Sequence, residues 1–366
     1  MASRRTHLGL RRGGSRLRSL PARPLTAALV GAALLLGGCN SAQEQAKLEL
    51  HEENCQNYYQ QGEFFRALQQ AELALSVDQD NVTMRIARGL CLLRIAKGAG
   101  DTDLLDQSID VFDELIDDVS VDEEYQAYLG HGSAHLQRFL ALDGSIGQLQ
   151  SRVDRGFLDE VSQAQEERLV ARHREMQAED LEVAEESFRE VLSLETHAEN
   201  SYAMVDLVLV LNAGGEKHED MVELANKALA LLDENNVVNG RMLENSAGLP
   251  TATKLALERR IETNGAKEQA LRDLLATVYF NKGELVPALE QLTLLADRGL
   301  MGEAQYYNRA EIYEQLGRFD LAVADLQSFM RMRSGYLTYE EDTLAPEIFR
   351  RIDELRAADA AALRRR

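Results

Sequence analysis

Two histidines, His131 and His135, lie four residues apart in a stretch that is predicted to be helical. This spacing turns both imidazoles to one face of a helix, where they can bind the same transition metal. The zinc-protease signature also needs a glutamate directly after the first histidine, and this chain has Gly132 there. No acidic residue stands at a spacing that marks a third ligand. We therefore predict no metal and no other cofactor, with the two histidines as weak metal candidates only.

Thiols are the other reactive groups, and two of the three cysteines, Cys55 and Cys91, lie in predicted helices. They can form a disulfide if the chain is exported, because exported proteins meet an oxidising compartment. They can also be two free thiols buried between helices, since free cysteine behaves as a small apolar residue. The sequence leaves both alternatives open.

Patterns for other kinds of catalysis are missing from the 366 residues. A glycine-rich phosphate loop of the GxxxxGK[ST] type is absent, and so is a GxSxG nucleophile elbow. We therefore predict that the protein is not an enzyme.

Charge is distributed unevenly along the chain. The formal net charge is −21, yet the first 38 residues hold seven arginines and no acidic residue. The remainder carries 33 Lys and Arg against 61 Asp and Glu, a net charge of −28. A body this acidic repels phosphate backbones, so nucleic acid is not an expected partner.

The arginine-rich start is followed by an uncharged stretch, Leu25–Leu36, and then by Gly37-Gly38-Cys39. A helix needs about 20 apolar residues to span a bilayer, so this stretch has the length of a signal-peptide core. The segment that ends in Cys39 resembles the lipobox of bacterial lipoproteins. The resemblance implies a signal peptide at residues 1–38, lipid attachment at Cys39 and a lipidated tether at residues 39–47. Several acyl chains together hold a protein stably on a membrane.

The residue after the lipidated cysteine is Asn40 rather than aspartate. In the enterobacterial sorting rule, this residue sends a lipoprotein to the outer membrane. The resemblance therefore implies a protein of the bacterial cell envelope, anchored by palmitate and other acyl chains in the outer membrane and facing the periplasm.

Two segments near the C-terminus repeat one pattern of residues at a spacing of 34. Small residues in the pattern let two helices cross closely, and its glycine provides the reversal between them in the left-handed region. The pattern is similar to the tetratricopeptide repeat (TPR), a pair of antiparallel helices. The matched positions are Ala276 and Ala310, Tyr279 and Tyr313, Gly283 and Gly317, Ala288 and Ala322, and Leu292 and Leu326.

The same template fits the front of the chain and, more weakly, its middle. The resemblance implies an all-α, TPR-like α-solenoid of about six helix pairs with a helical insertion and a C-terminal capping helix. The predicted segments are N-terminal TPR units at 48–136, a helical insertion at 137–183, degenerate TPR units at 184–235, a non-repeat linker helix at 236–268, C-terminal TPR units at 269–336, and a capping helix with a basic tail at 337–366.

TPR proteins usually bind peptides in a concave groove, and the repeat register predicts which side chains line it. The predicted lining is mostly acidic, aromatic or neutral, which favours a basic or amphipathic segment of a partner protein over a carboxylate ligand. The predicted residues are Glu52, Gln56, Tyr59, Ile86, Leu90, Arg94, His131, His135, Asp273, Thr277, Phe280, Tyr307, Glu311 and Glu314.

Together these features predict a membrane-anchored scaffold for protein–protein interaction, which binds an extended or helical segment of its partner in the groove. The alternative is a periplasm-facing lipoprotein that binds a glycan or a small molecule. Sugar-binding surfaces often stack their ligands on exposed tryptophan, and this chain contains none. The absence of tryptophan therefore favours the scaffold over the glycan binder.

Overall fold

The computed structural model describes residues 27–116, 121–155, 160–215, 218–335, 337 and 342–365. Within these ranges the chain forms α-helices and two short 3-10 helices, and no strand. It divides into two compact units, residues 1–49 and 50–366, and helix α1 (Ala27–Gln61) crosses the boundary between them. The first 26 residues of the predicted signal peptide lie outside the described residues, and so does the side chain of Cys39. None of the described helices combines the length and the apolar character needed to cross a membrane.

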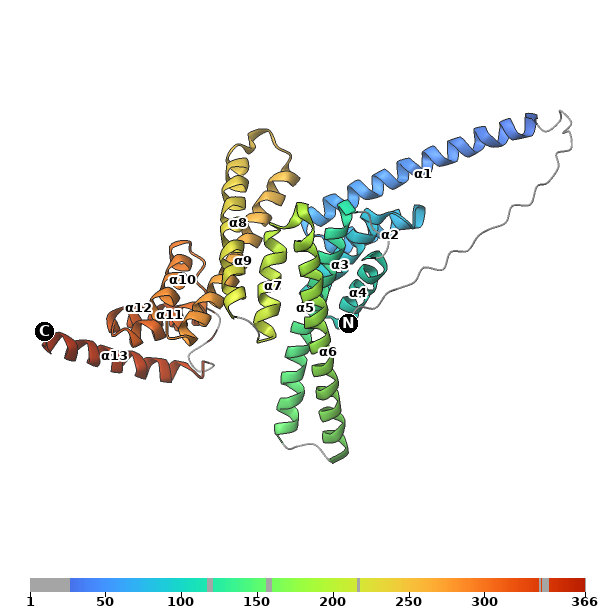
Figure 1. The fold of residues 1–366 in the computed structure, drawn as a ribbon. Coiled ribbons are helices and arrows are strands. Elements are labelled where there is room, and N and C mark those ends of the chain that lie inside the picture. Colours follow the sequence, from blue (N-terminus) through green and yellow to red (C-terminus); the bar gives the residue numbers. More distant parts are fainter. Residues whose placement is uncertain are drawn as a thin grey trace, which may run out of the picture. The chain divides into compact units, whose positions relative to one another are not determined.

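The larger unit consists of successive antiparallel helix pairs (Figure 1). Six pairs and a final single helix are described, which confirms the predicted all-α, TPR-like solenoid. The pairs are the end of α1 with α2 (Phe64–Val77), α3 (Val82–Ala99) with α4 (Thr102–Ile116), α5 (Val121–Asp154) with α6 (Glu160–Ser193), α7 (Ser201–Ala213) with α8 (His218–Glu244), α9 (Thr251–Asn281) with α10 (Leu285–Asp297), and α11 (Glu303–Gln315) with α12 (Phe319–Arg333), followed by α13 (Ala345–Arg365).

Left-handed glycines make the reversal inside several of these pairs, and three of them match the repeat position. Gly62, Gly283 and Gly317 have φ angles of 75°, 77° and 69°, in the left-handed region that strains other residues. In each case the helix before the glycine ends and the next begins two residues later. The left-handed glycine predicted from the repeat is confirmed.

Close helix crossing around Phe112 explains the smallest residues of the second and third pairs. Phe112 on α4 is fully buried, and its ring lies between Gly89 on α3 and Gly130 on α5. A Cβ atom added to Gly89 would lie 2.7 Å from the ring, and one added to Gly130 would lie 2.3 Å from it. The repeat therefore keeps a small residue at this position because a neighbouring helix already fills the space.

The insertion predicted at 137–183 is formed by the extended ends of one helix pair. Helices α5 and α6 run side by side and continue past their neighbours as a long hairpin (Figure 1). Ile146, Leu149 and Val170 form a small apolar cluster in the extended part. The second helix of the pair thus starts late in the sequence because the first one keeps going.

The segment at 236–268 does not form a separate linker helix. Helix α8 continues to Glu244, and α9 starts at Thr251 after Pro250 and runs without a break through the first helix of the predicted C-terminal units. Proline suits this start because its fixed φ angle fits the entry to a helix. At the other end, α13 packs Ile348, Ile352 and Leu355 against the last pair, as expected of a capping helix.

Candidate protein-binding groove

A groove of about 1100 Å³ lies between the first two helix pairs and α9. All six residues predicted for the first two units line it, namely Glu52, Gln56, Tyr59, Ile86, Leu90 and Arg94. They lie on the first helix of each pair at spacings of three or four residues, so each helix presents its set on one face. The volume exceeds the 300 to 1,000 Å³ or so that is usual for small-molecule pockets, which suits a segment of a polymer.

Contacts between helices hold this lining in place. The Asn81 side chain caps α3 by accepting from the Met84 N–H, and its amide donates to a Glu52 carboxylate oxygen over 2.7 Å. Arg94 donates from Nε to the Tyr59 hydroxyl over 3.4 Å, and this contact connects α3 to α1. The carboxylate of Glu52 and the phenol of Tyr59 are thus tied to the neighbouring helix.

The far wall of the groove comes from α9, which supplies Arg259, Arg260, Glu262 and Thr263. Arg259 donates to the carbonyl oxygens of Gln60 and Gln61 at the end of α1, where helix carbonyls lack intrahelical partners and attract cations. A Cβ atom on Gly62 would lie 2.8 Å from the Arg259 guanidinium nitrogens. No local pattern could have indicated this wall, because the contacting residues are almost 200 positions apart.

Two arginines of the groove act on the same phenol. Tyr202, at the start of α7, also lines the groove, and burial raises the pKa of its hydroxyl. The charges of Arg260 and Arg94 oppose that rise in pKa. The groove therefore brings a guanidinium from α3 and one from α9 close to a single tyrosine.

A second, much smaller pocket of about 100 Å³ lies between α9, α10 and α11. Three predicted residues line it, namely Thr277, Phe280 and Glu311, together with Ala276, Leu292, Asn308 and Ile312. Asp273, one turn before Thr277, is also predicted but is not part of this lining. Burial raises the pKa of the Asp273 carboxyl, against hydrogen bonds from the side chains of Gln305 and Asn308.

Two predicted residues of the last unit, Tyr307 and Glu314, are engaged by the capping helix. Arg351 on α13 donates to the Tyr307 hydroxyl over 3.0 Å and to Glu314 Oε2 over 3.0 and 2.6 Å. Its guanidinium also lies 3.8 Å from Glu311. The acidic face predicted to be open at this end is therefore partly neutralised by α13, because a capping helix covers the last repeat.

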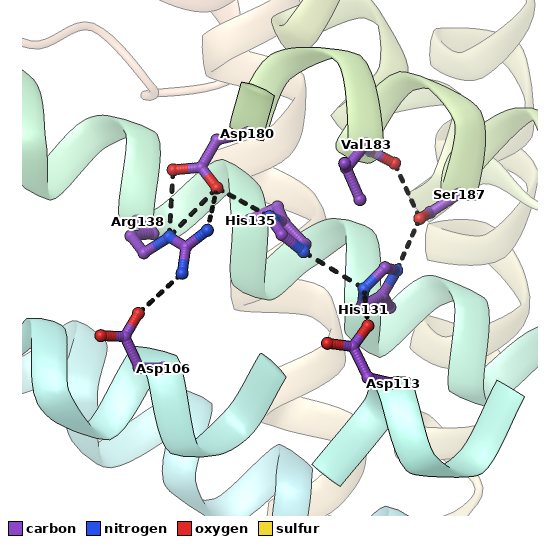
Figure 2. A network of polar contacts seen from close by, with 8 residues as sticks. All are labelled: Asp106, Asp113, His131, His135, Arg138, Asp180, Val183 and Ser187. Carbon is purple, nitrogen blue, oxygen red and sulfur yellow. Dashed lines mark hydrogen bonds and ion pairs between the residues drawn. The ribbon is translucent and has the colours of Figure 1, made fainter. Parts of the chain in front are cut away.

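The histidines do not line the groove, contrary to the prediction. His131 and His135 are 7% and 6% exposed, and they lie in a polar network between α4, α5 and α6 (Figure 2). Their Nε2 atoms are 3.2 Å apart, and His131 Nε2 is 2.9 Å from an Asp113 carboxylate oxygen. His135 Nδ1 is 2.7 Å from Asp180 Oδ1. The long α6 covers this face of α5, which the repeat register alone treats as open.

Every ring nitrogen of the two histidines has a polar neighbour. The Ser187 hydroxyl donates to the Val183 carbonyl over 2.8 Å, and its oxygen lies 2.9 Å from His131 Nδ1. His131 Nε2 faces Asp113 and His135 Nε2, and His135 Nδ1 lies 2.7 Å from Asp180 Oδ1. Burial, followed by the neighbouring charge at His135, lowers the pKa of His131 to about 4. The rings thus need no bound cation, and among the described residues no group of three or more His, Cys, Asp or Glu is arranged to hold a metal.

The charged part of the network is also paired. Asp180 is fully buried, and Arg138 donates to it through Nε over 3.1 Å and through Nη2 over 2.6 Å. Arg138 Nη1 reaches Asp106 on α4 over 2.7 Å (Figure 2). The aspartates and the hydrogen bonds they accept raise the pKa of Arg138 against the effect of burial. Each charge in this interior is therefore matched by a partner on another helix.

The two cysteines on the groove side are free and buried. A hydrogen bond between the thiols lowers the pKa of Cys55 and raises that of Cys91, which burial raises further. Cys55 also lines the groove. Of the two alternatives left open by the sequence, the structure contains the pair of buried free thiols.

Comparison with known proteins supports the repeat. A family model described as tetratricopeptide repeat matches residues 306–334, which cover most of α11 and α12. No curated protein matches the chain. Among solved structures, the chain is similar to a chain of the Cut9–Hcn1 hetero-tetramer of APC/C, with 13% identity, a TM-score of 0.30, and coverage of 85% of this chain and 51% of that chain. It therefore spans about half the length of that protein.

Two further solved structures are similar over most of both chains. Nro1, a hypoxic regulator of sterol synthesis and nuclear import adaptor, shares 15% identity with a TM-score of 0.37, and 82% of this chain and 90% of that chain are covered. Yeast Tom70 shares 11% identity with a TM-score of 0.22, and 87% and 97% are covered. Identities and TM-scores this low carry nothing about function to this chain.

The helix pairs, the left-handed glycines and the matched repeat define a TPR-type helical scaffold. Proteins of this class generally bind other proteins on extended concave surfaces and are generally not enzymes. The groove between the first two pairs and α9 is a concave surface of that kind.

Proposed function

We propose that this protein is a membrane-anchored TPR scaffold of the bacterial cell envelope that binds an extended or helical segment of a partner protein. The groove of about 1100 Å³ is the observation that supports this proposal most strongly. It combines apolar, aromatic and charged lining, and it is formed by the helix faces that TPR domains use for peptides. Its volume suits a chain segment better than a compact ligand.

The anchor follows from the sequence at the N-terminus. Cys39 stands at the end of a segment that resembles a lipobox, so acyl chains on this residue would hold the protein on the outer membrane, facing the periplasm. The chain after residue 38 carries a net charge of −28. A domain this acidic is repelled by anionic lipid, so it stands away from the membrane, where its groove is accessible.

The small pocket between α9, α10 and α11 suits a basic or amphipathic segment. Its walls are apolar apart from Thr277, Asn308 and Glu311, and Phe280 offers an aromatic face. A lysine or arginine of a partner that entered here would meet the carboxylate of Glu311, and its aliphatic stem would pack on the ring. This pocket is therefore the part of the surface that supports the prediction of a basic or amphipathic partner segment.

A photo-reactive amino acid at Tyr59 tests whether the groove binds a partner in the cell. We expect Tyr59 to cross-link to a defined envelope protein after irradiation, with the cross-linked peptide identified by mass spectrometry. Glu72, exposed on α2 and outside the groove lining, is the matched control position. Equal labelling at both positions, or none at Tyr59, would show that the groove does not hold a partner.

The anchor is tested separately by replacing Cys39 with alanine. The wild-type protein should incorporate labelled palmitate and partition into the detergent phase with outer-membrane markers. The Cys39→Ala variant should do neither. If the wild-type protein remains in the aqueous phase without label, the lipoprotein assignment is wrong, whereas the groove proposal is unaffected.

A further inference from the structure

We propose that the groove between the first two helix pairs and α9 recognises an acidic segment of the partner, with Arg94 and Arg260 binding its carboxylates from opposite walls. The inference rests on the proposed function of the groove and adds the sign of the charge that its ligand carries. It reverses the charge expected from the sequence, because the register predicted only one of the groove arginines.

The charged groups that line the groove differ in whether they already have partners. Glu52 accepts a hydrogen bond from Asn81, and Arg259 donates to two backbone carbonyls at the end of α1. In the part of the chain that the structure describes, neither Arg94 nor Arg260 forms an ion pair with a carboxylate; Arg94 has only the Tyr59 hydroxyl as a partner. Two guanidinium groups thus face the groove with unused donors.

The groove lining carries a small excess of positive charge although the chain as a whole is strongly acidic. The lining contains three arginines and two glutamates, Glu52 and Glu262. Lys97 lies one turn after Arg94 on α3, and its pKa is lowered by burial and then by the charge of Arg94. The charges of Arg94 and Lys97 repel each other, and a bound carboxylate would relieve that repulsion.

The side chains around the two arginines suit a peptide ligand. Guanidinium groups bind carboxylates through two parallel hydrogen bonds, and they keep their charge at any physiological pH. Tyr59 and Tyr202 line the groove near Arg94, although the Tyr202 hydroxyl donates to Asn264 and Lys267 lies 5.1 Å from its ring centroid. Ile86 and Leu90 add an apolar floor on the same helix. The ligand that matches all of these features is a segment in which Asp or Glu alternates with apolar or aromatic residues.

Nucleic acid also carries negative charge, but it matches the surroundings poorly. A phosphate backbone would have to approach a chain with a net charge of −28 after residue 38. A short acidic peptide presents few charges and buries them in the groove, so it meets less of that repulsion. The observations therefore favour a protein segment.

Fluorescence polarisation with the full chain in detergent tests the proposal. The probes are three fluorescein-labelled peptides of equal length, in which Phe and Leu alternate with Asp and Glu, with Asn and Gln, or with Lys. We expect the acidic peptide to bind about tenfold or more tightly than the amide peptide, and this preference should weaken as salt is added. A single-stranded DNA oligonucleotide serves as a competitor.

The double variant Arg94→Gln/Arg260→Gln should abolish the preference for the acidic peptide. Arg94→Lys/Arg260→Lys should keep part of it, because charge remains when the guanidinium fork is lost. Arg350→Gln, on an exposed pair with Glu354 outside the groove, is the matched control and should bind like wild type. Circular dichroism and the Tm check that each variant is folded.

Each other outcome has a defined meaning. Equal affinity for the acidic and amide peptides, or an unchanged preference in the double variant, overturns the charge assignment while the groove remains a binding site. Displacement of the acidic peptide by the oligonucleotide assigns the arginines to phosphate instead. If no peptide binds and Tyr59 yields no cross-link in cells, the proposed function of the groove fails as a whole.

Discussion

Two polar clusters of this molecule are built in opposite ways. Between α4, α5 and α6, the side chains of His131, His135, Arg138 and Asp180 are enclosed, and each one contacts a partner on another helix (Figure 2). In the groove, Arg94 and Arg260 are exposed, and their donors are largely unused. The first cluster has no spare bonding capacity for a ligand, whereas the second one does.

This difference shows that residue types alone indicate the wrong cluster as the binding site. A pair of histidines four residues apart attracts interest as a possible metal site, yet burial and hydrogen bonds make it part of the interior. Arginine is common on protein surfaces and attracts none, yet its placement on two walls of one groove makes it the better candidate for binding. Whether a polar group has a partner decides more about its role than its chemical type.

The largest expected effect comes from Asp180→Ala in the enclosed cluster. The change leaves Arg138 and His135 without their shared carboxylate in a buried position. Breaking a buried pair in this way costs about 3–5 kcal/mol, so the free energy of unfolding should fall by that amount in urea titrations. Glu185→Ala removes an exposed pair with Arg189 on the same helix and should cost less than about 0.5 kcal/mol. Similar losses in both variants would mean that the cluster is not a structural element.

Low pH should also lower the free energy of unfolding through this cluster, by slightly less than Asp180→Ala does. The pKa of His131 is about 4 in the folded chain, below its ordinary value of 6.5, so the unfolded state binds more protons between these values. The stability contributed by neutral His131 is therefore complete above pH 6.5 and is lost as the pH falls toward 4. The loss amounts to at most about 3 kcal/mol. In His131→Asn the pH dependence of the free energy of unfolding should be flatter over this range; an identical slope would contradict the assignment.

Packing around Phe112 separates stability from binding. Gly130→Ala places a methyl group 2.3 Å from the fully buried ring and should lower the free energy of unfolding by about 1–3 kcal/mol. In the double variant Gly130→Ala/Phe112→Leu, the smaller leucine side chain makes room for the new methyl group. This variant should recover part of the lost stability, measured as a higher Tm than that of Gly130→Ala. Because neither residue lines the groove, the folded double variant should keep its affinity for the acidic peptide. A lost affinity would show that repacking around Phe112 reaches the groove through Ile86 and Leu90, which share its apolar cluster.

The smallest expected effect is at the far wall of the groove. Arg259→Gln removes a charged donor from the carbonyls of Gln60 and Gln61 at the end of α1. Its side chain is partly exposed, so we expect a loss of only about 1 kcal/mol in stability. Hydrogen exchange should become faster at the end of α1 and at Gly62. Unchanged exchange there would show that α9 does not hold this wall.

The fold was predictable to a large extent because the same residue pattern occurs several times along the sequence. The spacing of 34 residues, the small residues and the left-handed glycines each limit the local backbone or the helix crossing, and these limits act within one or two helices. The predicted boundaries between segments in the middle of the chain, at 137–268, matched the helices less well. Helices α5, α6, α8 and α9 are long, and their extra turns contain no residue that marks where a repeat ends.

The candidate site was predictable only along single helices. The six groove residues of α1 and α3 follow from helical periodicity, and the structure places them on one surface. The same reasoning put His131 and His135 in the groove, where they are not, because it could not foresee that α6 covers them. It also missed Arg259 and Arg260, since α9 has no repeat pattern at that point.

By itself, the sequence determined the helix pairs, the turns between them and the acidic character of the chain, because these depend on neighbours within a few dozen residues. The tertiary structure alone decided which polar groups are paired and which are free. Asp180 meets Arg138 across 42 positions, and Arg259 meets the end of α1 across 199. Such contacts depend on how successive helix pairs stack, and small angles between the pairs add up over distances that no local pattern encodes.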